Sequence, residues 1–238
     1  ALRGYVATIS KSNYPADEKV IYLRDAMEVA QTVPQKKLIL NEAANNKTFP
    51  ALVFISKYLD DPQLQEDAAD EVSNIALSDK NFYGNDVKEW LNKSLQLKKG
   101  GDSDYEKVAI RKFINEMPSD AGFVALFNNK DLTGWKGLVG NPITRSKMDA
   151  ATLAKEQHKA DSIMNKGWYV KNGILNFSGE GENLCTVKQY RNFEMYVDWK
   201  IEPKGDAGIY LRGSPQVQIW DTSRVDVGAQ VGSGGLYN

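Results

Sequence analysis

The sequence predicts a multidomain α and β chain, in which an N-terminal α-helical, solenoid-like domain is followed by a β-sandwich. Two observations lead to this prediction. Apolar residues recur at helical spacing as far as Met117, and beyond that point glycine becomes frequent and alternation with period two takes over. The change falls at PSDAG, residues 118–122, which places a domain boundary there. We therefore expect a helical domain over residues 1–118 and a sandwich domain over residues 122–238.

Composition narrows the classes of function. The chain has 238 residues with 42% hydrophobic content, which lets each domain bury its own core. A formal net charge of -1, with no basic run interleaved with aromatic residues, argues against a nucleic-acid partner. No window approaches the roughly 20 apolar residues of a membrane helix, so no membrane span is expected. The single cysteine, Cys185, excludes an internal disulfide and a multi-cysteine metal site.

The first domain is expected to be helical because apolar residues at helical spacing mark four or five helices between residues 14 and 117. Pro15 and Pro50 suit first helical turns, and Asp86 is placed to cap a later helix. The helices recur at a spacing of roughly 30 to 40 residues, which predicts stacked, HEAT-like helix pairs of the solenoid kind. Such a domain is expected to dock a protein partner or to brace the sandwich.

Short segments bounded by Gly, Asn or Pro predict the strands of the second domain, at residues 123–127, 168–170, 174–177, 193–201, 208–212 and 216–220. The segment FEMYVDWKI, residues 193–201, alternates between apolar and polar side chains. We expect its apolar set to enter a core: Phe193, Met195, Val197, Trp199 and Ile201. A helix over about residues 148–165 interrupts the strands, with Asp149 as its N-cap.

The stretch GDAGIYLRGSPQVQIWD, residues 205–221, predicts two strands around a tight turn. Alternation turns the apolar side chains inward and leaves one outward face with Tyr210, Arg212, Gln216, Gln218 and Trp220. Arginine and amide groups offer forked hydrogen bonds, and aromatic rings offer a flat apolar surface. This combination suits a sugar, whose hydroxyl groups need polar partners and whose C–H face needs an aromatic ring. An ordinary exposed sheet face is the alternative, and the residues alone leave both open.

Several motifs in the second domain carry a resemblance to a known family. They are LFNNKDLTGW (126–135), WYVKNGIL (168–175), NLCTVKQYRNFEMYVDWKI (183–201), the 205–221 stretch and GSGGLYN (232–238). With them, residues 122–238 resemble the 3-keto-disaccharide hydrolase family, whose fold is a concanavalin-like jelly roll. Asn129, Asn172 and Ala207 depart from the family pattern, and none of them lies on the polar face.

The resemblance implies cleavage of 3-keto-glycosides, including 3-keto-disaccharides. A ketone at C3 acidifies the C2–H bond, so a general base can remove that proton, the glycosidic oxygen can leave and water can then add. In this chemistry Arg212 would stabilise or orient the oxyanion, because it is permanently charged and forked. Asp198 and Asp221 are candidates for base, acid or metal ligand. Sugar hydroxyls would be bound by Tyr210, Gln216 and Gln218, with Trp220 and Lys188 as weaker candidates.

Each candidate has a structural alternative. Arg212 could pair with Asp198 or Asp206 within the sheet, and Asp221 could cap a turn. His158, the single histidine, is expected at a solvated surface position, which disfavours a histidine-based metal site or triad. No cofactor is certain, and a divalent metal such as calcium is the candidate. The carboxylates of GEGE, residues 179–182, could bind calcium, although a polar turn fits them better.

Further expectations follow from the resemblance. Members of the family continue with more strands after GLYN, so the sandwich is expected to be incomplete at its C-terminus, with unpaired strand edges. The family's usual setting, together with a sequence that begins without methionine, leads us to expect an extracytoplasmic, periplasmic protein whose signal peptide has been removed. The alternative to an enzyme is a non-catalytic carbohydrate-binding module joined to a helical protein-interaction domain.

Overall fold

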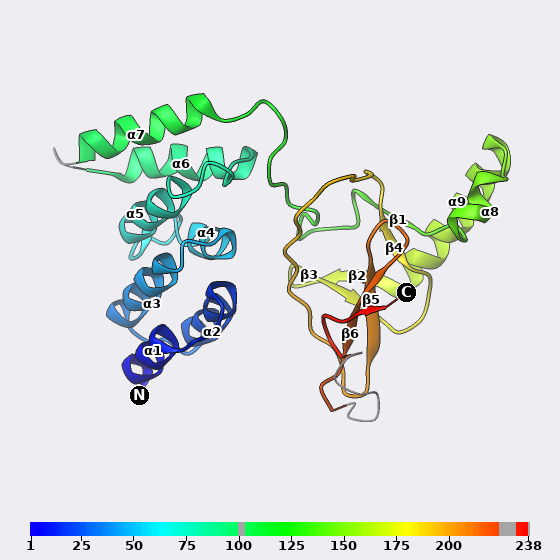
Figure 1. Ribbon diagram of the computed structural model, residues 1–238, viewed down its shortest axis with the longest axis horizontal. Helices are drawn as coiled ribbons and strands as arrows, with labels where there is room; N and C mark the ends of the chain where they lie inside the picture. The colour runs from blue at the N-terminus through cyan, green and yellow to red at the C-terminus, as the bar shows by residue number, and fades with distance from the viewer. Residues whose placement is uncertain (100–102, 224–231, 238) are drawn as a thin grey trace. The chain divides into compact units, whose positions relative to one another are not determined.

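The computed structural model describes residues 1–99, 103–223 and 232–237. The chain divides into two compact units, Ala1–Val124 and Ala125–Asn238. The first unit is built from helices and the second carries short antiparallel strands with an inserted helix (Figure 1). A helical part followed by a sheet-bearing part is therefore confirmed. None of the helices in the described ranges is long and apolar enough to cross a membrane.

The helical unit has more helices in its described part than the four or five that the sequence predicts. They are α1 (Leu2–Lys11), α2 (Ala16–Glu28), α3 (Val33–Asn45), α4 (Phe49–Ser56), α5 (Gln65–Ala76), α6 (Asn85–Leu97) and α7 (Ser103–Glu116). The prediction missed α1 and α3, and α1 buries only Val6 and Ile9 and has no side-chain cap. Neighbouring helices in the chain pack against each other, from α1 against α2 to α6 against α7.

Local sequence explains where several helices begin. Thr32 forms a capping box with Gln35 at the start of α3, and the side chain of Thr48 accepts a backbone hydrogen bond at the start of α4. Asp86 was predicted to cap α6, and this is wrong. The N-cap is Gly84, whose φ of +152° favours glycine, and Asp86 lies in the first turn, where a carboxylate favours the helix dipole.

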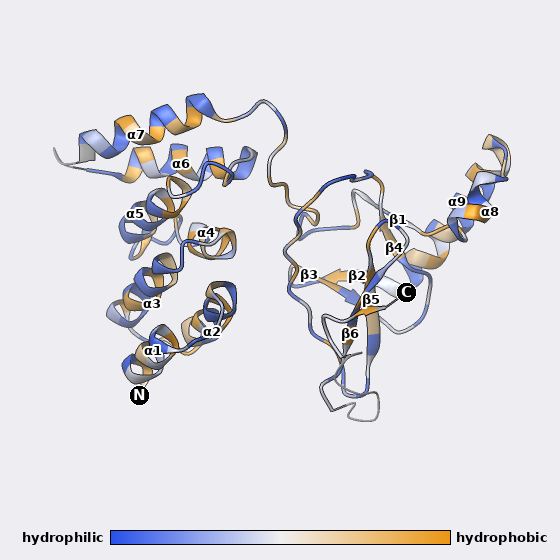
Figure 2. Cartoon of the chain, in the orientation of Figure 1, coloured by the Kyte–Doolittle hydropathy of each residue, from blue (hydrophilic) through white to orange (hydrophobic). Residues whose placement is uncertain are grey.

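The core of the helical unit comes from the apolar faces of these helices. Hydrophobic and hydrophilic residues are interspersed along most of the helices, whereas α4 is largely hydrophobic (Figure 2). The largest fully buried side chains include Leu23, Leu40, Leu52, Ile55, Ile75 and Leu91, each 0% exposed. Burying one such side chain contributes about 1.5–3 kcal/mol. The residues of this core cluster belong to the first unit.

The strand that the sequence predicts at residues 123–127 is absent. Instead, the Phe123 ring stacks on Phe49 of α4 at a centroid distance of 3.8 Å, and its backbone N–H donates to the carbonyl oxygen of Tyr83 at 2.9 Å. Gly122 has φ +55°, and a Cβ there would lie 2.3 Å from the Tyr83 oxygen. The apolar side chain that alternation assigned to a sheet is therefore used by the helical unit.

The second unit contains short strands and two helices in its described residues. They are β1 (Trp135–Gly137), α8 (Pro142–Ser146), α9 (Ala150–Gly167), β2 (Trp168–Lys171), β3 (Ile174–Phe177), β4 (Leu184–Thr186), β5 (Asp206–Tyr210), β6 (Gln216–Trp220) and β7 (Leu236–Tyr237). They form three antiparallel sheets, β1 with β4, β2 with β3, and β5-β6-β7. The inserted helix is confirmed, because Asp149 caps α9 by accepting from the backbone of Thr152 at 2.7 Å.

The strand and buried face predicted for residues 193–201 are wrong. This segment has no strand pairing among the described residues, and Phe193, Val197 and Trp199 are 44%, 52% and 47% exposed. Alternation records only which side chains would share a face. A strand also needs a neighbour for its N–H and C=O groups, and no described segment of the chain supplies one here.

Candidate functional site

The hairpin of β5 and β6 gathers polar side chains on one face of its sheet. Its register pairs Asp206 with Trp220, Gly208 with Gln218, and Tyr210 with Gln216. Directly opposed residues of an antiparallel pair lie on the same face. The predicted polar face is therefore present, and Asp206 belongs to it although the sequence prediction did not count it as a site residue.

Hydrogen bonds join three of these side chains into a chain. The Gln216 amide nitrogen donates to the Gln218 oxygen at 2.7 Å, and the Gln218 nitrogen donates to Asp206 Oδ1 at 2.7 Å. Gln218 is only 5% exposed, and its backbone pairs with residues 234–235 beside β6. The prediction that Gln218 faces outward to bind a hydroxyl therefore needs correction, since its amide is enclosed and already bonded at both ends.

Glycine at position 208 leaves room for this series of hydrogen bonds. A Cβ at Gly208 would lie 1.9 Å from Nε2 and 2.3 Å from Cδ of Gln216. The Gln216 side chain thus crosses over Gly208 to reach Gln218. Any larger residue at position 208 would displace the amide.

Arg212 lies in the turn between the two strands, not within β5 as predicted. It is exposed and has φ +57°, and Gly213 beside it has φ +99°. A non-glycine residue in the left-handed region is strained, and such strain gathers at ligand sites and in tight turns. Tyr210, two residues earlier at the end of β5, is 55% exposed.

Asp221 lies at the other end of the hairpin. Its Oδ2 accepts from the backbone N–H of Lys204 at 2.6 Å and from the hydroxyl of Ser223. This is the turn-capping contact that the sequence left open as an alternative. The five residues of β6 at about 3.4 Å each put roughly 17 Å of strand between the Arg212 turn and Asp221. The structure does not bring these two candidates together.

The remaining candidates lie outside the hairpin. Asp198 is exposed in the segment 193–201, which forms no strand, and Lys188 is exposed with its Nζ 5.2 Å from the ring centroid of Tyr190. Sequence reasoning missed Ser233, whose hydroxyl accepts from the Trp220 backbone N–H at 2.9 Å and donates to the Trp220 carbonyl at 2.8 Å. Asn238 of the GSGGLYN motif lies outside the described residues.

Metal ligands do not gather in the part of the chain that the structure describes. It holds no group of three or more His, Cys, Asp or Glu side chains that could bind a metal ion. The predicted calcium candidates at residues 179–182 form a polar turn, in which the Glu182 carbonyl accepts from the Trp168 indole at 2.9 Å. His158 is exposed, as predicted. These donor sets do not fit a metal site.

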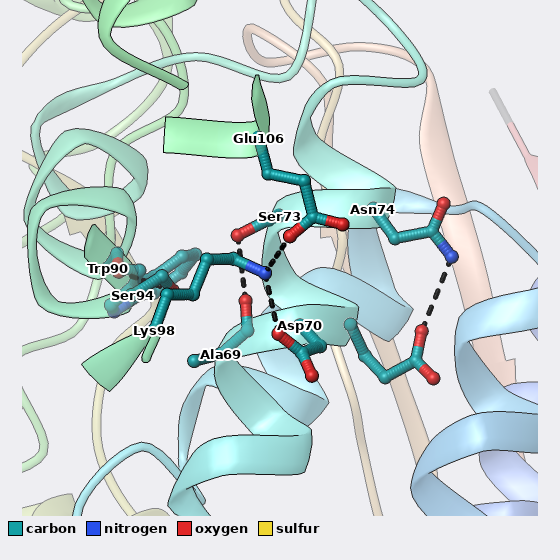
Figure 3. Close-up of polar contacts among 9 residues, drawn as sticks. Ala69, Asp70, Ser73, Asn74, Trp90, Ser94, Lys98 and Glu106 are labelled. Atoms are coloured by element: carbon teal, nitrogen blue, oxygen red, sulfur yellow. Dashed lines mark hydrogen bonds and ion pairs between the residues drawn. The ribbon is translucent and has the colours of Figure 1, made fainter. Parts of the chain in front are cut away.

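A second polar cluster lies in the helical unit (Figure 3). The Lys98 side chain is 3% exposed, and its Nζ donates to Asp70 Oδ1 at 2.5 Å and to Glu106 Oε2 at 2.6 Å. Burial acts to lower the pKa of Lys98, but the two carboxylates outweigh burial and hold this pKa above its usual value. Because the three residues come from α5, the end of α6 and α7, the cluster ties these helices together.

The sheet unit is similar to a known protein family. Residues 122–238 match the 3-keto-alpha-glucoside-1,2-lyase-like domain. A 3-keto-disaccharide hydrolase from Bacteroides thetaiotaomicron is 24% identical over 105 residues, which are 40% of this chain and 29% of that relative. The chain thus spans less than a third of the relative's length. No solved structure matches the chain.

Proposed function

Because residues 122–238 belong to the 3-keto-alpha-glucoside-1,2-lyase-like family, we propose that the protein is an enzyme that cleaves 3-keto-glycosides such as 3-keto-disaccharides. The single observation that carries this proposal is the hydrogen-bonded polar face of β5 and β6, with an arginine turn at one end and Trp220 at the other. Amides beside aromatic rings suit a polyhydroxylated ring.

The proposed reaction proceeds by elimination followed by addition of water. A base takes the proton from C2, and the electron pair of that C–H bond enters an enolate stabilised by the C3 ketone. The C1–O bond then breaks, the aglycone oxygen takes a proton, and a C1=C2 bond forms. Water adds its oxygen to C1 and a proton to C2, which yields the free 3-keto sugar. The net change is hydrolysis.

Within this reaction, we assign Arg212 to the enolate oxygen, because a permanently charged guanidinium can stabilise the negative charge that develops there. Tyr210 and Gln216 form the neighbouring pair and would bind hydroxyl groups. Gln218 supports Gln216 instead of meeting the ligand, and Trp220 would cover the C–H face of the sugar. Asp198 stays the proposed proton-transfer residue, to be tested by replacement with Asn, whereas Asp221 is set aside because roughly 17 Å of strand separates it from the Arg212 turn.

The experiment is a paired assay of methyl α-D-glucoside and its 3-keto counterpart, with released sugar measured by mass spectrometry. Wild type should cleave the keto compound and leave the parent glucoside intact, whereas Arg212→Ala should lose cleavage. Arg191→Ala is the matched control, because Arg191 is an exposed arginine of the same unit outside the hairpin. Equal cleavage by both variants would refute the role of Arg212.

A non-catalytic carbohydrate-binding module is the second candidate, and one observation favours it. Tyr210 is 55% exposed and Arg212 is exposed as well, so this end of the face is open to solvent. An open face is sufficient for binding, whereas proton transfer needs positioned groups. Binding of the keto sugar without turnover would favour the carbohydrate-binding module over the enzyme.

The finer features of the architecture belong to the same proposal. We infer that the sheets are part of a concanavalin-like jelly roll, and that the consecutive packing of the helices is a HEAT-like solenoid that docks a protein partner. We also place the protein in the periplasm. Cell fractionation tests the location, and cross-linking in cells to the helical unit tests the partner.

A further inference from the structure

We propose that Asp206 sets the donor and acceptor polarity of the sugar-binding face, so that Gln216 offers a ligand its carbonyl oxygen. Asp206 would then be a positioning residue that makes the face select hydroxyl donors over ligands that only accept. This inference rests on the proposed function for the identity of the ligand. Its physical basis lies within the β5–β6 hairpin.

The starting point is that an ionised carboxylate can only accept hydrogen bonds. Asp206 Oδ1 lies 2.7 Å from an amide atom of Gln218, which must therefore be the nitrogen. The oxygen of the same amide then points to Gln216 at 2.7 Å. A carbonyl oxygen can only accept, so Gln216 must present its nitrogen in turn. One carboxylate thereby fixes the orientation of two successive amides.

The series of hydrogen bonds ends at the Gln216 amide, which is the group proposed to contact a ligand. Gln216 Nε2 has two protons, one directed to Gln218 and one to the Ala207 carbonyl at 3.5 Å. Gln216 is half-buried beside exposed Tyr210, and among the described residues no donor reaches its Oε1. The group left for a ligand is therefore an acceptor, which matches a sugar hydroxyl acting as donor.

Burial keeps the hydrogen-bonded series of Asp206, Gln218 and Gln216 from rearranging. Gln218 is 5% exposed, so an amide turned by 180° would place its oxygen against the Asp206 carboxylate and its nitrogen against that of Gln216, with little water to replace the lost bonds of the buried amide. Gly208 leaves room for the observed arrangement, because the Gln216 side chain crosses the space that a Cβ would fill. The bond to the Gln218 oxygen then holds Gln216 in a single orientation.

The test reverses the polarity of the chain by paired substitutions. In Gln216→Glu, a carboxylate faces the Gln218 oxygen, and the Gln218 amide cannot turn to offer its nitrogen because that nitrogen is bonded to Asp206. The two oxygens repel each other, so affinity for methyl 3-keto-α-D-glucoside should fall about tenfold. In the double variant Asp206→Asn with Gln216→Glu, the amide at 206 can donate to the Gln218 oxygen and Gln218 can donate to the new carboxylate. The hydrogen-bonded chain then closes in the opposite direction.

The measurements are titration calorimetry with the keto sugar and thermal unfolding of each variant. Adding Asp206→Asn to Gln216→Glu should restore Tm and recover affinity to within about threefold of wild type. Glu202→Gln added to Gln216→Glu is the matched control, because it removes one negative charge without touching the chain. It should restore neither property. A merely structural role for Asp206 predicts that the two losses add and that no rescue occurs.

The outcomes separate the two proposals. If Asp206→Asn rescues Tm and the control does not, the chain polarity is established even where the wild type binds no keto sugar, and only the proposed function fails. If the wild type binds the sugar but Asp206→Asn rescues no better than the control, the polarity inference is overturned and the proposed function stands. Gly208→Ala provides an independent check, because it displaces Gln216 without changing charge.

Discussion

Replacing Gly208 by alanine tests the polar face with the smallest available change. The new Cβ would lie 1.9 Å from Gln216 Nε2, whereas ordinary contact begins at 3.4 Å. The amide must therefore move by about 1.5 Å, which stretches its 2.7 Å hydrogen bond to Gln218 to roughly 4 Å, beyond hydrogen-bonding range. The displaced Gln216 also loses its proposed hydrogen bond to the ligand, which is worth about 1 kcal/mol, so binding of methyl 3-keto-α-D-glucoside should weaken about fivefold.

The same variant should remain folded. The atoms displaced belong to the end of a flexible side chain, and Gly208 lies outside the left-handed region, so the free energy of unfolding should change by no more than about 1 kcal/mol. Titration calorimetry and urea unfolding measure the two quantities. Gly4→Ala is the control, because a Cβ there meets nothing within 4 Å and should leave affinity unchanged. Wild-type affinity in folded Gly208→Ala would refute the reasoning.

Two further predictions concern pH and the buried lysine. Hydrogen bonds from Thr133 and Asn128 lower the pKa of Asp131 to about 2, below its unfolded value of 3.8. The stability that they contribute is complete above pH 3.8 and is lost as pH falls through about 2. An NMR titration of the Asp131 carboxyl group should show this, and a midpoint near 3.8 would contradict it. In the helical unit, removing both Asp70 and Glu106 with alanine leaves a buried ammonium without its partners and should cost about 2–3 kcal/mol in urea unfolding, more than Lys98→Met. The opposite order would show that the cluster does not act as an ion-pair network.

The sequence predicts well those features that depend on one segment. Helical spacing identified most helices of the first unit, and Asp149 with the periodic residues after it identified α9. Alternation also placed Tyr210, Gln216 and Trp220 on one face of the hairpin, because strand pairing preserves which side each residue faces.

Features that depend on distant partners were beyond sequence reasoning. Phe193 and Trp199 alternate as a core strand would, but alternation says nothing about which segment pairs with them. The Gln218 amide bonds to Asp206, 12 residues away, and the partners of Lys98 lie 28 and 8 residues away. Such contacts arise from tertiary packing, which no local pattern encodes.

The most direct test of the central claim follows the C2 proton during cleavage of methyl 3-keto-α-D-glucoside in heavy water. Elimination followed by hydration predicts one solvent deuterium at C2 of the released 3-keto-glucose, after subtraction of the exchange that this sugar shows without enzyme. The parent glucoside should remain uncleaved. Release of 3-keto-glucose without deuterium at C2 would mean direct displacement at C1 and would contradict the proposed mechanism.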